Sequence, residues 1–228
     1  MFKSRSIAAA LAFTGTTAFA QGIDFSGFVD ALDGGAADYE ITLTNITPGQ
    51  TFTPQLVVTH AADISLFQLG EPASMELEIL AEGGDTGPLT DAVVNVVSYV
   101  DTVPGLLLPG ASVSTMVMGS DGDVISMAAM LIPTNDTFAA LDSMPLPAEG
   151  SVTYYLKAYD AGTEENDQNC RNIPGPRCGG EGYNGESADG DEGFVHVSNG
   201  FHRLPGNTLR PNTYDWRNPV AKVTVTRR

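Results

Sequence analysis

Apolar and polar side chains alternate along much of this chain, and this alternation predicts β-strands. In residues 39–44 the apolar Tyr39, Ile41 and Leu43 alternate with polar neighbours, the period of two expected of a strand with one buried face. A short apolar run over residues 56–59 follows Pro54, at a position where a strand can begin. Five further segments with alternating or continuous apolar residues are also candidate strands: 112–118, 124–131, 151–159, 193–198 and 220–226.

Turn-forming residues separate these candidate strands, as in Pro109-Gly110, Asp121-Gly122 and Pro205-Gly206. Many short strands with glycine and proline between them are typical of a sandwich or a barrel. Two short helices are expected in the connections, over residues 72–81 and 88–95, since a proline stands near the start of each. The predicted fold class is therefore all-β and antiparallel, with one or two short connecting helices.

The N-terminus has the layout of a secretory signal. Lys3 and Arg5 precede a short apolar run over residues 7–13, and Ala18-Phe19-Ala20 has the small-x-small pattern of a cleavage site. A buried N-terminal helix is the alternative interpretation. We expect residues 1–20 to be a signal peptide, 21–37 a flexible leader and 38–228 one domain exported to the periplasm or the cell exterior. Elsewhere no apolar run reaches the roughly 18 residues of a membrane span.

The charge of the chain is strongly negative. Its formal net charge is −17 at pH 7, and loss of residues 1–20, which contain basic residues and no acidic ones, would make it more negative. A protein with this charge repels nucleic acid and attracts cations, so we exclude a nucleic-acid partner. A hydrophobic content of 42% still allows a packed core.

Two cysteines, Cys170 and Cys178, lie in a long acidic and glycine-rich segment over residues 160–192. In an exported chain we expect them to form a disulfide. The segment has almost no apolar periodicity, and loops this long in compact domains are usually functional or disordered.

Acidic residues that follow predicted strands are candidate ligands for calcium. Calcium takes six to eight oxygen ligands, commonly from loops. Asp160 follows the strand that ends at Tyr159, with Glu164 nearby, and Asp136 lies at another strand exit. The EF-hand pattern is absent. Solvated loop acids remain the alternative interpretation.

Other chemistry has less support in the sequence. His60, His196 and His202 could meet at a transition metal, but no ligand spacing favours this over isolated histidines. The Gly-x-Ser-x-Gly motif of many hydrolases is absent. A glycosidase with two carboxylates stays open, because the separation of such a pair cannot be read from a sequence. We expect no enzyme activity.

Four segments together resemble the spondin N-terminal domain, the domain of F-spondin and mindin, and in particular its bacterial secreted branch. They are residues 39–45 (YEITLTN), 81–86 (AEGGDT), 133–136 (PTND) and 159–164 (YDAGTE), in the order expected of that family. The resemblance implies a C2-like β-sandwich that carries one calcium ion at a loop-rich end and serves attachment to a matrix or a cell surface.

The same resemblance implies which residues hold the ion. Asp136 matches one family aspartate, and Asp160 and Glu164 match the two acids of an Asp-Ala-Gly-Thr-Asp segment. Thr137 departs from the tryptophan of the animal domains, and Glu164 from the family aspartate. The leading hypothesis is thus a calcium-binding recognition or adhesion module with an extracellular protein or glycan as its unknown ligand. A secreted carbohydrate-active or hydrolytic enzyme is the alternative.

Overall fold

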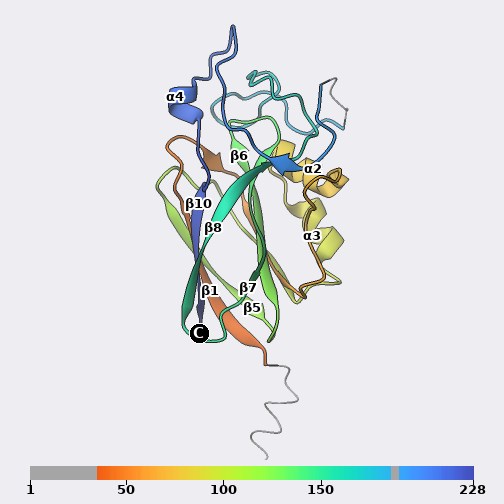
Figure 1. The fold of residues 1–228 in the computed structure, drawn as a ribbon, viewed down its shortest axis with the longest axis vertical. Coiled ribbons are helices and arrows are strands. Elements are labelled where there is room, and N and C mark those ends of the chain that lie inside the picture. Colours follow the sequence, from red (N-terminus) through yellow and green to blue (C-terminus); the bar gives the residue numbers. More distant parts are fainter. Residues whose placement is uncertain (1–34, 186–189) are drawn as a thin grey trace, which may run out of the picture. The chain divides into compact units, whose positions relative to one another are not determined.

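The structure is a computed structural model that describes residues 35–185 and 190–228 (Figure 1). The predicted signal peptide and most of the predicted leader lie outside these residues. The strands are β1 (Ala37–Asn45), β2 (Thr51–Phe52), β3 (Gln55–His60), β4 (Tyr99–Val103), β5 (Ser112–Gly119), β6 (Val124–Ile132), β7 (Thr137–Pro145), β8 (Ser151–Asp160), β9 (His196–Val197) and β10 (Ala221–Arg227). The helices are α2 (Met75–Gly83), α3 (Gly87–Val93) and α4 (Pro211–Tyr214).

All neighbouring strands are antiparallel, in the order β4-β3-β6-β7-β8-β10-β1-β5. The two edge strands approach each other, and the Tyr99 hydroxyl on β4 donates to the Met116 carbonyl on β5 at 3.4 Å. The first part of β8, up to Leu156, pairs with β10, whereas its last residues pair with β7. A strand that changes partner in this way joins two packed layers. The predicted all-β antiparallel class is confirmed.

One layer of the sandwich has a solvent-exposed face. It is formed by β5, β1, β10 and the first part of β8. Its inward residues, among them Tyr39, Ile41 and Leu43, belong to the main core. Its outward face carries cross-strand pairs of hydroxyl groups, such as Thr42 with Ser114 at 2.9 Å. This one-sided burial is the physical reason for the alternation seen in the sequence.

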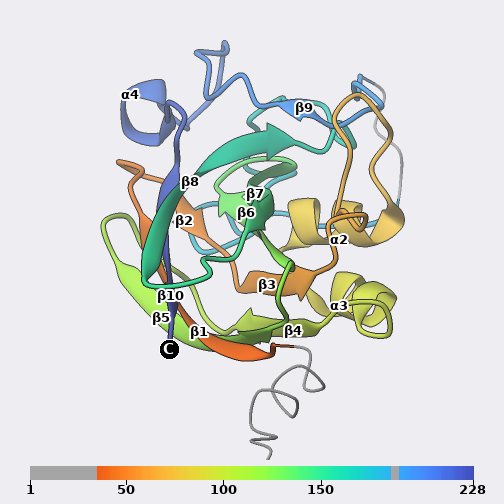
Figure 2. The same ribbon diagram turned by 60° about the horizontal axis from the view of Figure 1, so that its bottom comes forward.

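The layer formed by β3, β6 and β7 is covered on both faces. All nine residues of β6 are buried. One face joins the main core, and the other packs against α2 and α3 through a second cluster that includes Leu77, Leu80 and Phe138. Figure 2 shows both helices on this side of the molecule. The sequence predicted β6 from its long apolar run but did not predict β7, whose apolar run is shorter and ends at the exposed Asp142.

The capping residues Ser74 and Gly84 determine where helix α2 begins and ends. The Ser74 hydroxyl accepts a hydrogen bond from the Leu77 N–H at 3.3 Å, so the helix starts after Pro72 and not at it. Gly84 ends the helix in the left-handed conformation, with φ 72°, and its N–H donates to the Leu80 carbonyl. The predicted helix over 72–81 is therefore correct in type but shifted. The predicted strand over 193–198 forms only as the two residues of β9.

The two ends of the described domain lie at one pole of the sandwich. Tyr39, near the start of β1, pairs with Arg227 at the end of β10. Strand β8 leaves this pole at Ser151 and ends at the other pole, at Asp160 (Figure 1). Within residues 35–185 and 190–228, no helix is long and apolar enough to cross a membrane.

Candidate metal centre

Two of the predicted ligands lie side by side at the pole where β8 ends. Thr137, the first residue of β7, pairs with Asp160, the last residue of β8. Asp136 therefore stands opposite Ala161, whose N–H donates to the Asp136 carbonyl at 3.2 Å. Antiparallel pairing thus brings together acids that are far apart in the sequence.

The Asp136 side chain is fully buried, with 0% of the residue exposed. Its Oδ2 accepts hydrogen bonds from the backbone N–H groups of Thr163, at 2.8 Å, and Glu164, at 3.2 Å. Its Oδ1 has no hydrogen-bond partner among the described residues. Asp136 therefore fixes the backbone of the third predicted ligand, Glu164, and keeps one oxygen unpaired in the interior.

Asp160 is also buried, and its two oxygens are held in place by different groups. The Gly162 N–H donates to Oδ1 at 3.1 Å, and the Asn166 side-chain amide donates to Oδ2 at 3.0 Å. The same amide donates to Glu192 Oε1 at 3.2 Å. Asn166 thus positions two carboxylates at once.

A fourth acid, Glu82, joins this region from the last turn of α2. It is 2% exposed, and its Oε1 has no hydrogen-bond partner in the described part of the chain. A carboxylate near a helix C-terminus lies at the negative end of the helix dipole, which disfavours its charged form. The sequence analysis missed Glu82, although an acid in the last helical turn was a usable signal. We call Glu82, Asp136, Asp160 and Glu164 the acid cluster.

Burial raises the pKa of every member of the acid cluster, and repulsion from other members adds to the rise at Asp136 and Glu164. Desolvation is the largest cause in each case. The pKa of Glu82 rises to about 7 and that of Glu164 to about 8, with the charge of Glu82 as the next cause for Glu164. The pKa of Asp136 is raised further by Asp160, while His196 opposes the rise at Asp160. Such shifts mark a place where negative charge lacks a counterion.

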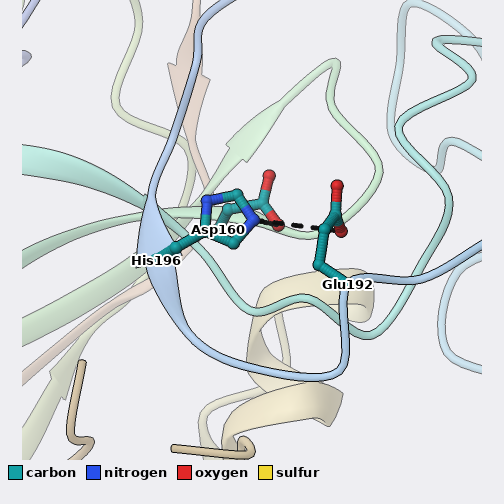
Figure 3. Close-up of side chains that lie close together, drawn as sticks. All are labelled: Asp160, Glu192 and His196. Carbon is teal, nitrogen blue, oxygen red and sulfur yellow. Dashed lines mark ion pairs between the residues drawn. The ribbon is translucent and has the colours of Figure 1, made fainter. Parts of the chain in front are cut away.

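A histidine lies at the open side of the same centre. Ligand atoms of Asp160, Glu192 and His196 all lie within 4.8 Å of one another (Figure 3). His196 Nε2 is 3.4 Å from Asp160 Oδ1 and 3.9 Å from Glu192 Oε2. We call these three residues the histidine cluster. Glu192 was not predicted, because only folding brings it beside the end of β8.

The three histidines do not share one site. His60 is buried, and its Nε2 lies 2.8 Å from the Ser126 hydroxyl. His60 pairs with Val124 at the start of β6, and the nine-residue strand separates this level from Ile132 by about 26 Å. Ile132 lies at the pole that holds Asp136, so His60 is at the far end of the sandwich.

The segment that follows Asp160 is fastened at several points. Cys170 and Cys178 form the predicted disulfide. Asn135, next to Asp136, accepts a hydrogen bond from the Gln168 N–H at 3.1 Å and donates to Asp167 at 3.0 Å. A polar cavity of about 690 Å³ lies beside the disulfide. The acid cluster is therefore built on a loop with fixed geometry.

Comparison with known proteins identifies the family. The family model described as Spondin_N matches residues 41–169, more than half of the chain. This match contains Asp136, Asp160 and Glu164, whereas Glu192 and His196 lie beyond it. No curated protein matches the chain. The chain belongs to the spondin N-terminal domain family.

Proposed function

We propose that this chain is a secreted calcium-binding recognition or adhesion module of the spondin type, and not an enzyme. Calcium is held by Asp136, Asp160 and Glu164. The observation that carries this proposal is the Asp136 carboxylate, which is fully buried beside a second buried acid and has one oxygen without a hydrogen-bond partner in the described part of the chain. Burying an unpaired charge is costly unless a counterion compensates it.

The donor set fits a hard cation. Asp136, Glu164 and Glu82 each have a buried carboxylate oxygen without a hydrogen-bond partner among the described residues. Oxygen-only ligands from loops are the type that calcium prefers. When bound, calcium would neutralise these carboxylates. The residues themselves hold the loop in place, because Asp136 already accepts the N–H groups of Thr163 and Glu164.

Support for secretion and recognition comes from outside the acid cluster. Residues 1–20 have the pattern of a signal peptide, and a disulfide is typical of exported proteins. The cavity beside the disulfide is lined by polar groups that include Asp167, Arg171 and Asn207. Such a lining suits an extracellular protein or a glycan, which would bind at the same pole as calcium.

The test is thermal unfolding with and without calcium. Protein stripped with EDTA should regain stability as calcium is added. At a free calcium concentration about 100 times Kd the gain is about 2.7 kcal/mol, or a rise in Tm of about 5–11 °C for a chain of this size. Asp136→Asn should abolish the rise. Asp142→Asn, which changes an exposed acid on β7, the strand that follows Asp136, should keep it.

Two results would count against the proposal. The first is a wild-type Tm that does not respond to millimolar calcium. The second is an equal response in Asp136→Asn, which would place the ion elsewhere. An activity screen on glycans and esters addresses the enzyme alternative. Turnover that is lost in Asp136→Asn and Asp160→Asn would favour a hydrolase.

A further inference from the structure

His196 reaches Asp160 because a short piece of sheet forms beyond the main sandwich. In β9, His196 pairs directly with Asp160, and Val197 pairs with Tyr159. The approach depends on Gly162, which has φ 69° and whose carbonyl accepts the Gly193 N–H at 2.8 Å. A Cβ at Gly162 would collide with the backbone of Phe194. The backbone therefore holds His196 against the end of β8.

The imidazole ring of His196 is oriented as a metal ligand would be. Its Nδ1 lies 3.1 Å from the Val197 carbonyl, which can only accept a hydrogen bond, and an imidazole ring that donates from Nδ1 can present a lone pair at Nε2 to a metal. Nε2 is buried and has no hydrogen-bond partner within residues 35–185 and 190–228. Metal-bound histidines commonly donate their other ring N–H to a backbone carbonyl in this way.

The spacing of the ligand atoms suits an ion better than a proton. Charge-assisted hydrogen bonds between nitrogen and a carboxylate span about 2.7–2.9 Å. The Nε2 of His196 is 3.4 Å from Asp160 and 3.9 Å from Glu192. Two ligand atoms that each lie about 2.1 Å from a tetrahedral zinc ion are about 3.4 Å apart. The two separations from His196 therefore leave room for a small cation, and the ligand atoms of all three side chains lie within 4.8 Å of one another.

The residues around the histidine cluster also favour a bound cation. Asn166 donates to both Asp160 and Glu192, as outer partners of ligating carboxylates do. Asp136 is fully buried, with one oxygen that no described residue pairs, and the charges of Asp160 and Glu192 both act on it. A cation between them would offset that repulsion.

We propose that Asp160, Glu192 and His196 form a second metal site, which binds a first-row transition ion of the zinc type. One nitrogen and two carboxylate oxygens form a ligand set that suits zinc and leave a fourth position open. Because Glu192 and His196 lie outside the acid cluster, the site does not depend on the calcium proposal. Asp160 is the residue that the two sites share.

The proposal is tested by titrating purified protein, stripped of metals, with zinc chloride alone. One zinc ion per chain should bind. His196→Ala should weaken binding at least ~100-fold, since loss of a ligand exceeds the 10–100-fold cost of losing an outer partner. His202→Ala, an exposed histidine in the next segment, should bind zinc as wild type does. Cobalt should give visible absorption bands that His196→Ala lacks.

Further variants distinguish the two proposed metal sites from each other, and distinguish the loss of a ligand from the loss of the fold. Glu164→Gln should lose the calcium response and keep zinc, whereas His196→Gln, which preserves volume, should do the reverse. Circular dichroism of each variant checks the fold. Zinc that does not bind to wild type, or that binds equally well to His196→Ala and His196→Gln, would overturn the second site and leave the calcium proposal untouched.

Discussion

The acid cluster and the histidine cluster meet at Asp160 but differ in depth and in donor chemistry. The acid cluster lies under the loop, with oxygen donors only, and three of those oxygens are buried and have no hydrogen-bond partner among the described residues. The histidine cluster lies at the open side, where Glu192 is exposed and a nitrogen replaces one oxygen. Under our two proposals, a cation would offset the buried charge of the first cluster, whereas the geometry of the second suits a different ion. One strand end would then contribute to two metal sites.

The largest effect is expected from the residue that the clusters share. Asp160→Asn should abolish the calcium-induced rise in Tm and also weaken zinc binding at least ~100-fold, because both ions lose a charged ligand. The fold should persist, since asparagine preserves the shape and can still accept a hydrogen bond from Gly162. Calorimetry with each metal measures both losses. Loss of one response alone would show that Asp160 serves a single site.

Next in size is the effect of pH on the metal-free protein. The pKa values of Glu82 and Glu164 are raised to about 7 and about 8 in the folded state. Groups with raised pKa stabilise the fold fully below their unfolded pKa of about 4.3, and this stabilisation is lost as pH rises through the folded pKa. Tm measured in EDTA should therefore fall by several degrees between about pH 5 and about pH 8.5.

Calcium should reduce this fall in Tm, because the ion stabilises the ionised carboxylates. Glu164→Gln should reduce it as well, since one titrating group is gone. A metal-free Tm that rises over the same pH range would contradict the burial of uncompensated acids.

A smaller effect is expected where the backbone brings the histidine cluster together. Gly162→Ala should destabilise the domain by about 1–3 kcal/mol and weaken zinc binding, because Cβ would push Phe194 and β9 away. Gly193→Ala is the matched control. It has φ 74°, and no atom of the described residues lies within 4 Å of the new Cβ, so it carries the backbone strain without the collision. Equal zinc affinities in the two variants would disprove this role of Gly162.

The smallest effect concerns the amide that bridges the two carboxylates. Asn166→Ala should weaken zinc binding about 10-fold. The calcium response should change less, because Asp136 keeps its hydrogen bonds from Thr163 and Glu164. Asn172→Ala, which removes a similar amide bonded to Asp167, serves as the control in zinc titrations. A larger loss for calcium than for zinc would assign Asn166 to the acid cluster.

Sequence patterns predicted most strands of both layers. β1 and β10 alternate because water covers one side of their sheet, and both were predicted nearly to the residue. β6, which is covered on both faces, was predicted from its long apolar run. β7 was missed, since its buried apolar run over residues 138–141 is short and includes Ala139 and Ala140, and alanine has a low β-propensity.

The candidate site was predictable to a similar degree. Asp136 and Asp160 lie at the ends of predicted strands, so their places at a sheet end could be read from the sequence. Glu82 and Glu192 depend on how a helix end and a distant loop pack against β8. The histidines were grouped as a candidate set, yet His60 lies in the core beside Ser126. Contacts between distant segments, and not residue types, decide which acids meet.

The shared pole of Tyr39 and Arg227 has a consequence for how the domain is displayed. Any segment joined before β1 or after β10 would attach at the pole away from Asp160. If such a segment anchored the molecule, the loops around Asp160 would face outward, with access for a large ligand. Because β1 and β10 are antiparallel neighbours, a force applied between the two ends would open that pair from its terminal hydrogen bonds first, far from Asp160.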